Sequence, residues 1–305
     1  MIKKLIKKFL INYQDNKKRM IGLSHIINTR NKYSKITNLN DLDYKIFSQN
    51  GEDGIIDYIL ECLKIKKPNF IEIGIGDYSE SNTRFIFETR SLRGLVIDCL
   101  SDLKKKINQN IKSWKGELNI EEIFISTENI LEILDKNNFY STDLLSIDID
   151  GIDYWILNKL KKNYSKIIVL EYNSVFGNNI EVTVPNINSF NRSNYHFSNL
   201  CYGMSLKAAI KLMDKKNYYF LGTNYLKNNA FFISKDFPKS QFFPNLEIEQ
   251  ISEATNSYLT ESRNTKGKLN FLKGADKLKE IMKCEIIDLS NDKQELKKLD
   301  EIINN

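Results

Sequence analysis

The sequence predicts an α/β fold with a mostly parallel, doubly wound sheet, on three observations. Short apolar runs alternate with segments of helical periodicity between about residues 47 and 173. The first apolar run leads into two glycines, an arrangement typical of a strand that turns beneath a ligand. Two more apolar runs around an Asn-rich turn, within residues 218–236, predict a terminal antiparallel hairpin. Alternation of this kind favours a parallel sheet with helices on both faces.

Taken in order, each apolar run predicts a strand and each segment of helical periodicity predicts a helix. The expected strands lie at residues 68–76, 94–98, 121–126, 143–150 and 166–173, before the hairpin. The expected helices lie at residues 51–64, 81–91, 100–111, 127–137, 154–162 and 205–217. Thr127 is the expected cap of the fourth helix, because Thr accepts a bond from the first free backbone N–H groups.

The length and composition fit one large domain with two extensions. The chain has 305 residues, of which 41% are apolar, enough for a sizeable core. We expect a basic helical extension at 1–46, the α/β domain at 47–238 and a helical extension at 239–305 that covers the active site. Four scattered cysteines and two histidines exclude a zinc site and leave little room for a nucleophilic triad. The cysteines are expected to be buried, reduced thiols.

The positive charge is concentrated at the amino terminus. The first 35 residues hold ten Lys or Arg against one Asp, whereas the whole chain has a net charge of +6, so the rest is slightly acidic. This distribution argues against nucleic acid as a partner. Residues 1–12 predict a basic amphipathic helix, which either lies on an anionic membrane or packs on the body or a partner subunit. The lack of a signal peptide or long apolar run predicts a soluble, cytoplasmic protein.

A cofactor site is predicted where the first two strands end. In "FIEIGIGDYSESNT", Gly74 and Gly76 permit a tight turn, and Glu72 precedes them. The third glycine of a nicotinamide-binding turn is replaced by Ser79, and an acid before the turn suits a cationic ligand such as a sulfonium with an α-amino group. Asp98 ends the second strand, where it can accept hydrogen bonds from a ribose diol. An ordinary strand-to-helix turn is the alternative.

A second polar cluster follows the fourth and fifth strands. "SIDIDGIDYW" contains Asp148, Asp150 and Asp153, and "LEYN" contains Glu171 and Asn173. Two carboxylates about 4 Å apart repel by roughly 4 kcal/mol at an effective dielectric of about 20, so the fold must supply a proton, a cation or donors. A metal such as Mg²⁺ or Ca²⁺ held by Asp148, Asp150, Glu171 and Asn173 is one solution. Alternatively, an acid such as Asp148 is a general base with a raised pKa, and Asp153 begins a helix.

Two other segments supply candidate residues. His196, in a polar insertion at residues 174–202, is the other candidate base. Gln49 and Glu52, in "SQNGEDG", either line the cofactor pocket or cap the helix that follows.

Together, the motifs "FIEIGIGDYSESNT", "GLVID", "LLSIDIDGIDYW", "IIVLEYN" and "NNAFFI" resemble the class I S-adenosylmethionine-dependent methyltransferases, and most of all the FkbM-type branch. The resemblance spans residues 48–235. It implies a seven-stranded Rossmann-like methyltransferase sheet in which the first acid, the glycines and the second acid hold the cofactor. These residues are Glu72, Gly74, Gly76 and Asp98. The chain departs from the FkbM-type pattern at Tyr78, where a further glycine is common, and in its DxDG, where Asp-Val-Glu-Gly is usual.

The function expected from these features is transfer of a methyl group from S-adenosylmethionine to a hydroxyl of a sugar or other polar metabolite, as in surface glycan biosynthesis. No Asn/Asp-Pro-Pro-aromatic motif, which amine-directed methyltransferases often carry, follows the fourth strand. One alternative is a metal-dependent glycosyltransferase that uses Asp148 and Asp150 as a DxD motif with Mn²⁺. The other is a noncatalytic scaffold that recruits partners through its amino-terminal helix.

Overall fold

The computed structural model of the chain describes residues 2–90, 93–111, 115–247, 261–291 and 293–304. The chain forms two compact units. Unit 1 comprises Met1–Ile123, Thr142–Ser146 and Phe237–Glu247, and unit 2 comprises Phe124–Ser141, Ile147–Asp236 and Ile248–Asn305. This division differs from the three-part division expected from the sequence, whose boundaries stay predictions.

The central feature is a seven-stranded sheet with the strand order β3-β2-β1-β4-β5-β8-β7. Its strands are β1 (Asn69–Ile73), β2 (Arg93–Asp98), β3 (Glu117–Glu122), β4 (Thr142–Ile147), β5 (Ser165–Glu171), β7 (Tyr218–Thr223) and β8 (Asn229–Ser234). β2 pairs in parallel with β1 and β3, whereas β8 runs antiparallel to β5 and β7. The predicted fold class, a mostly parallel sheet with a terminal antiparallel hairpin, is confirmed.

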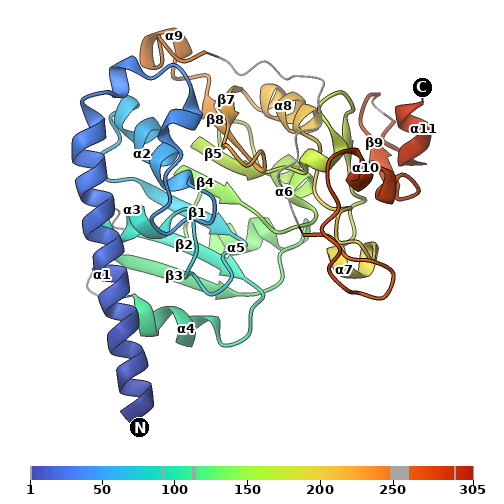
Figure 1. The fold of residues 1–305 in the computed structure, drawn as a ribbon. Coiled ribbons are helices and arrows are strands. Elements are labelled where there is room, and N and C mark those ends of the chain that lie inside the picture. The colour runs from blue at the N-terminus through green and yellow to red at the C-terminus, as the bar shows by residue number, and fades with distance from the viewer. Residues whose placement is uncertain (1, 91–92, 112–114, 248–260, 292, 305) are drawn as a thin grey trace. The chain divides into compact units, whose positions relative to one another are not determined.

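One helix follows each of the first four parallel strands, and further helices precede and follow this part of the chain (Figure 1). The helices are α1 (Ile2–Arg30), α2 (Glu52–Cys62), α3 (Arg84–Thr89), α4 (Leu103–Asn110), α5 (Ile130–Lys136), α6 (Asp153–Lys159), α7 (Arg192–Tyr195), α8 (Leu206–Lys215), α9 (Lys239–Phe242), α10 (Ala275–Ile281) and α11 (Leu299–Ile303). Short 3-10 turns lie at Tyr33–Lys35, Leu39–Leu42 and Ser174–Phe176. None of the described helices has the length and apolar composition that crossing a membrane requires.

The central strands are buried on both faces. Every side chain from Leu95 to Ile97 in β2, and from Leu144 to Ile147 in β4, is almost completely inaccessible to solvent. Strands covered by helices on both sides read as continuous apolar runs rather than alternating ones. For this reason the apolar runs of the sequence locate the parallel strands well.

Two elements differ in position from the prediction. β3 ends at Glu122, whereas the sequence predicted a strand at 121–126, because β3 pairs from Glu117 with Arg93 at the start of β2. As an edge strand it needs no continuous apolar run, and the apolar pair Ile123 and Phe124 lies exposed after it. α5 begins at Ile130 rather than at Thr127, since the Asn129 side chain accepts a bond from Ser126 N and holds a turn before the helix.

The amino-terminal helix is longer than the predicted residues 1–12. α1 continues to Arg30 because residues of its second half bind other parts of unit 1: Arg19 pairs with Glu88, and Arg30 pairs with Asp57. The predicted side-chain pattern of residues 1–12 lies outside the described side chains, except at Leu10, which is exposed.

The sequence predicted a helical carboxyl-terminal extension, but this extension also contains strands. Residues Glu285–Asp288 and Glu295–Lys298 form β9 and β10, which join β6 (Val182–Thr183) in a three-stranded antiparallel sheet. These strands are short and rich in Glu and Lys, so their sequence resembles that of a polar helix. Of the cysteines, Cys201 and Cys284 are buried, Cys62 is partly buried and Cys99 is exposed, which corrects the expectation of four buried thiols; all four are free.

Candidate active site

In unit 1, the loop after β1 has a left-handed backbone. The φ angles are +84° at Gly74, +55° at Gly76 and +64° at Tyr78. A side chain costs roughly 1–2 kcal/mol in this region of φ, which explains the two glycines. Space beside Gly76 is open, since no atom lies within 4 Å of where a Cβ would stand. The loop therefore leaves room for a ligand against its backbone.

The carboxylate of Asp98 is fixed at the end of β2 by two backbone donors. Gly76 N donates to Oδ2 at 2.8 Å, and Leu100 N donates to Oδ1 at 2.8 Å. A carboxylate has about four acceptor positions, and the side chain of Cys99 is also hydrogen-bonded to Asp98, so Asp98 keeps capacity for a further donor. Asp98 and Gly76 lie together as the sequence predicted, in an arrangement that can accept a ribose hydroxyl.

Glu72 is hydrogen-bonded to the loop at residues 81–83. Its Oε2 accepts bonds from the hydroxyls of Ser81 and Thr83, both at 2.5 Å, and from Thr83 N at 3.0 Å, while Oε1 accepts from Asn82 N at 2.8 Å. Burial raises the pKa of Glu72, and these donors partly offset the rise. Glu72 thus positions this loop, and its direct contact with a ligand stays a prediction.

In the segment before α2, Gly51 holds the N-cap position with no side-chain cap bond, so the structure does not show the helix capping expected of Gln49 or Glu52. Gln49 is exposed, and Glu52 is buried and accepts a bond from Asn50 N at 2.9 Å. Asp53 closes the turn: its Oδ2 accepts from the backbone N–H groups of Ile46, Phe47 and Ser48 and from the Ser48 hydroxyl. Burial raises the pKa of Asp53 to about 6. A contact of Gln49 with a cofactor remains a prediction.

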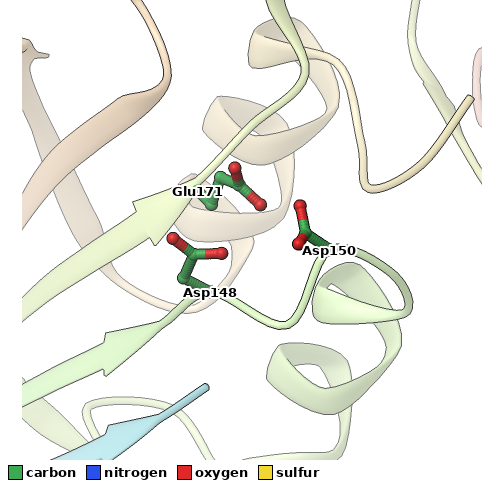
Figure 2. Close-up of side chains that lie close together, drawn as sticks. All are labelled: Asp148, Asp150 and Glu171. Atoms are coloured by element: carbon green, nitrogen blue, oxygen red, sulfur yellow. The ribbon is translucent and has the colours of Figure 1, made fainter. Parts of the chain in front are cut away.

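In unit 2, three of the predicted acids converge. Asp148 directly follows β4, Glu171 ends β5, and Asp150 lies in the turn before α6 (Figure 2). Each offers a carboxylate oxygen, and these oxygens all lie within 4.8 Å of one another. The side chains point toward one another (Figure 2). The sequence prediction of an acid cluster is thus met by the geometry.

A proton relieves part of the repulsion in this cluster. Burial and the charges of Asp148 and Asp150 raise the pKa of Glu171 well above its ordinary value, and Glu171 and Asp148 are hydrogen-bonded to each other. Two carboxyl groups that share a hydrogen bond hold one proton between them and titrate as a pair. One of the three negative charges is thereby removed.

A guanidinium offsets a second charge, and this contact was not predicted. Arg192 Nη1 donates to Asp150 Oδ1 at 2.5 Å, and its guanidinium lies over the ring of Tyr202, 5.2 Å from the ring centroid. Tyr202 is itself buried. One feature of the sequence could have pointed to this contact: Arg192 is the only Lys or Arg in the insertion at residues 174–202.

One predicted ligand, Asn173, serves the fold instead, and Asp153 begins a helix as the sequence predicted. The Asn173 amide donates to the carbonyls of Leu200 and Tyr202, at 2.8 and 3.0 Å, and accepts from Val175 N. Asn173 is therefore not a ligand beside the acids. Asp153 is buried at the first residue of α6, where it accepts bonds from Ile149 N and Gly151 N; burial raises its pKa to about 6.

His196 contacts groups outside the acid cluster. Its Nδ1 lies 2.7 Å from the Ser198 hydroxyl, and its ring is hydrogen-bonded to Cys284. The thiol of Cys284 is also hydrogen-bonded to the thiol of Cys201. These contacts lower the pKa of Cys284 to about 6. The partners of His196 in the structure are thus a hydroxyl and a thiol, not the carboxylates of the acid cluster. Its role as a base stays a prediction.

The acid cluster supplies three of the four predicted metal ligands, with one oxygen of each close enough together to hold an ion. Oxygen ligands suit Mg²⁺ and Ca²⁺, but the Asn173 oxygen is engaged elsewhere and Asp150 binds a guanidinium. Asp148 and Glu171 are already joined through a hydrogen bond. A metal would have to displace both the proton and Arg192.

Comparisons with known proteins give structural similarity only. No known protein family matches the sequence, and no curated protein matches it. A methyltransferase from Clostridium acetobutylicum that depends on S-adenosylmethionine is 10% identical, with 60% of this chain and 90% of that chain covered and a TM-score of 0.39. The magnesium protoporphyrin IX methyltransferase of Synechocystis, solved with bound S-adenosylmethionine, is 8% identical, with 60% and 77% covered and a TM-score of 0.39.

A fibrillarin pre-rRNA processing protein from Methanococcus jannaschii is also similar, at 8% identity, with 55% of this chain and 67% of that chain covered and a TM-score of 0.36. At such identities and TM-scores, the activity of this chain has to be decided from its own residues.

Proposed function

We propose that the chain is an S-adenosylmethionine-dependent methyltransferase that methylates a hydroxyl group. One observation carries the cofactor assignment: the Asp98 carboxylate at the end of β2 is aligned by the N–H of Gly76, in an open left-handed loop after β1. This loop and this acid follow neighbouring parallel strands, as ligand-binding residues do in doubly wound sheets.

The residues of unit 1 fit the parts of this cofactor. Asp98 would accept a bond from a ribose hydroxyl, and the backbone at Gly74 and Gly76 would lie against the ligand. Glu72 holds the loop at residues 81–83 in place. The bound cofactor supplies an electrophilic methyl group on a sulfonium.

The acid cluster of unit 2 supplies a base for the acceptor. The hydroxyl proton passes to the Asp148–Glu171 pair, leaving both carboxyl groups neutral. Burial and the neighbouring charges raise the pKa of Glu171, and a carboxyl pair of this kind accepts a proton more readily than an exposed carboxylate does. Asp150 keeps its negative charge, which is paired with the guanidinium of Arg192.

The proposed acceptor and cellular location rest on the sequence. The resemblance to the FkbM-type branch supports a sugar or another polar metabolite as the acceptor, with a role in glycan biosynthesis in the cytoplasm. The glycosyltransferase alternative requires Asp150 to bind Mn²⁺, and the contact of Asp150 with Arg192 gives that alternative no support.

The test is a transfer assay with methyl-labelled S-adenosylmethionine and a panel of monosaccharides and nucleotide-linked sugars. We expect label on an acceptor hydroxyl, unaffected by EDTA, and a loss of about 10²- to 10⁴-fold in kcat in Asp148→Asn, the range for removing a general base. Glu261→Gln is the matched control, because Glu261 is exposed and acts on Asp150 only through its charge. Mn²⁺-dependent sugar transfer, or full methyl transfer by Asp148→Asn, would contradict the proposal.

A further inference from the structure

α1 has two faces of different character. One face packs against the rest of unit 1: Asp15 pairs with Arg84 at 2.5 Å, and Arg19 pairs with Glu88 at 2.9 Å. Farther along this face, Ile26 is buried against Ile46 and Phe47. Residues 15, 19, 22, 26 and 30 recur every three or four positions, so they share one side of the helix. α1 is thereby held along this side.

The opposite face of α1 is apolar and exposed. Tyr13, Met20 and Ile27 are 61%, 72% and 69% exposed. Their spacing of seven residues, close to two helical turns, places them in one line. Leu23, which lies beside this line, and Leu10, toward the amino terminus, are also exposed. We call these five side chains the outer face of α1. Single exposed apolar side chains are ordinary, but a continuous line on a helix is typical of an interaction surface.

The charge around the outer face identifies the kind of partner. The first 35 residues contain ten Lys or Arg and one acid, Asp15, and that acid is paired with Arg84. Of the ten basic residues, Arg19 and Arg30 are paired with acids and Lys18 lies over the Phe47 ring. Lys17 is exposed on the same side, one turn after Tyr13. A second copy of the chain would bring like charges together across the face. An anionic surface is complementary to it.

We propose that the outer face of α1 docks on a membrane surface that contains anionic phospholipid, with the helix lying parallel to the bilayer. The apolar line enters the boundary between headgroups and acyl chains, and the lysines contact the headgroups, as in interfacial amphipathic helices. This inference goes beyond the proposed methyl transfer and does not depend on it.

The test is co-sedimentation of the full chain with large unilamellar vesicles. One set is pure phosphatidylcholine, and the other contains about 30% phosphatidylglycerol. We expect binding to the anionic vesicles at least tenfold tighter than to the neutral ones, and weaker in about 0.5 M NaCl because salt screens the attraction. The double variant Met20→Glu/Ile27→Glu should lose at least tenfold in affinity.

The control variant is Leu131→Glu/Leu296→Glu, which changes two exposed leucines on α5 and β10 and should bind like the wild type. Circular dichroism checks that both variants are folded. Failure to bind anionic vesicles, or binding that Met20→Glu/Ile27→Glu leaves unchanged, would overturn the proposal. A wild-type dimer in sedimentation velocity that this double variant converts to monomer would overturn it too, because a second copy would then cover the outer face.

Discussion

Two buried glutamates, one in β1 and one at the end of β5, have opposite surroundings. Glu72 in β1 accepts four hydrogen bonds from residues 81–83. Glu171 at the end of β5 lies among other carboxyl groups and is hydrogen-bonded to Asp148. Burial raises the pKa of both, but only Glu72 is compensated by donors. Glu72 is therefore part of the fold, whereas Glu171 has the surroundings of a reactive group.

This difference shows that the hydrogen-bond partners of a buried acid, and not its pKa alone, distinguish a structural acid from a reactive one. A pKa shift by itself marks both residues as candidate site residues. The hydrogen bonds separate them, because four donors hold the Glu72 carboxylate to its loop, whereas Glu171 is bonded to another carboxyl group.

The largest expected effect comes from making the same substitution at both positions. Glu72→Gln places an amide N–H₂ against donors of the loop and removes charge-assisted bonds, so the free energy of unfolding should fall by about 2–4 kcal/mol. Glu171→Gln removes like-charge repulsion and should leave stability within about 1 kcal/mol of the wild type, or raise it. Urea denaturation at pH 7 measures both. Equal losses in the two variants would remove the distinction between the sites.

The pH dependence of stability sharpens the same comparison. Because the pKa of Glu171 in the fold is above its ordinary value of 4.5, the folded state holds more protons than the unfolded state above that pH. The stabilising contribution of protonated Glu171 is complete below pH 4.5 and is lost as the pH rises through the higher, folded pKa, at up to about 1.4 kcal/mol per pH unit.

The readout is a difference, since Glu72, Asp53 and Asp153 shift in the same direction. The free energy of unfolding of Glu171→Gln minus that of the wild type should increase from pH 5 upward. A difference that stays flat with pH would show that Glu171 is ionised throughout the range.

The role of Arg192 can be tested by removing it. Arg192→Ala takes away the cation that contacts Asp150 and leaves three acids together, so Ca²⁺ affinity measured by calorimetry should rise about tenfold or more over the wild type, equivalent to about 1.4 kcal/mol. Arg192→Lys keeps the charge and should resemble the wild type. Tight Ca²⁺ binding by the wild type itself would instead revive the predicted metal site.

A smaller effect is expected at the cofactor loop. Gly76→Ala should lower the free energy of unfolding by about 1–2 kcal/mol through backbone strain alone, because φ is +55° and the added methyl group meets no atom. Gly76→Asn should cost less, since Asn tolerates this conformation better. If both variants were as stable as the wild type, the left-handed turn would be in doubt.

The sequence predicted those features that depend on local pattern. Buried parallel strands are continuous apolar runs, so the sheet and the positions of Asp98, Asp148 and Glu171 followed from them. Arg192 was missed because it reaches Asp150 across 42 residues from an insertion without periodicity. The use of Asn173 was also missed, since its partners are backbone carbonyl groups, which the sequence does not distinguish. The strands β9 and β10 are too short and too charged for their pattern to differ from that of a helix.

The most direct test of the central claim is isothermal titration of the full chain with S-adenosylmethionine, with Asp98→Ala and Glu171→Gln measured beside the wild type. We predict micromolar binding by the wild type and by Glu171→Gln, and an affinity at least about tenfold weaker in Asp98→Ala, a loss of about 1.4 kcal/mol or more. Asp102→Ala, which changes an exposed acid near the same strand end, should bind like the wild type. Absence of binding by the folded wild-type chain, or an affinity that Asp98→Ala does not change, would contradict the assignment of this site to the cofactor.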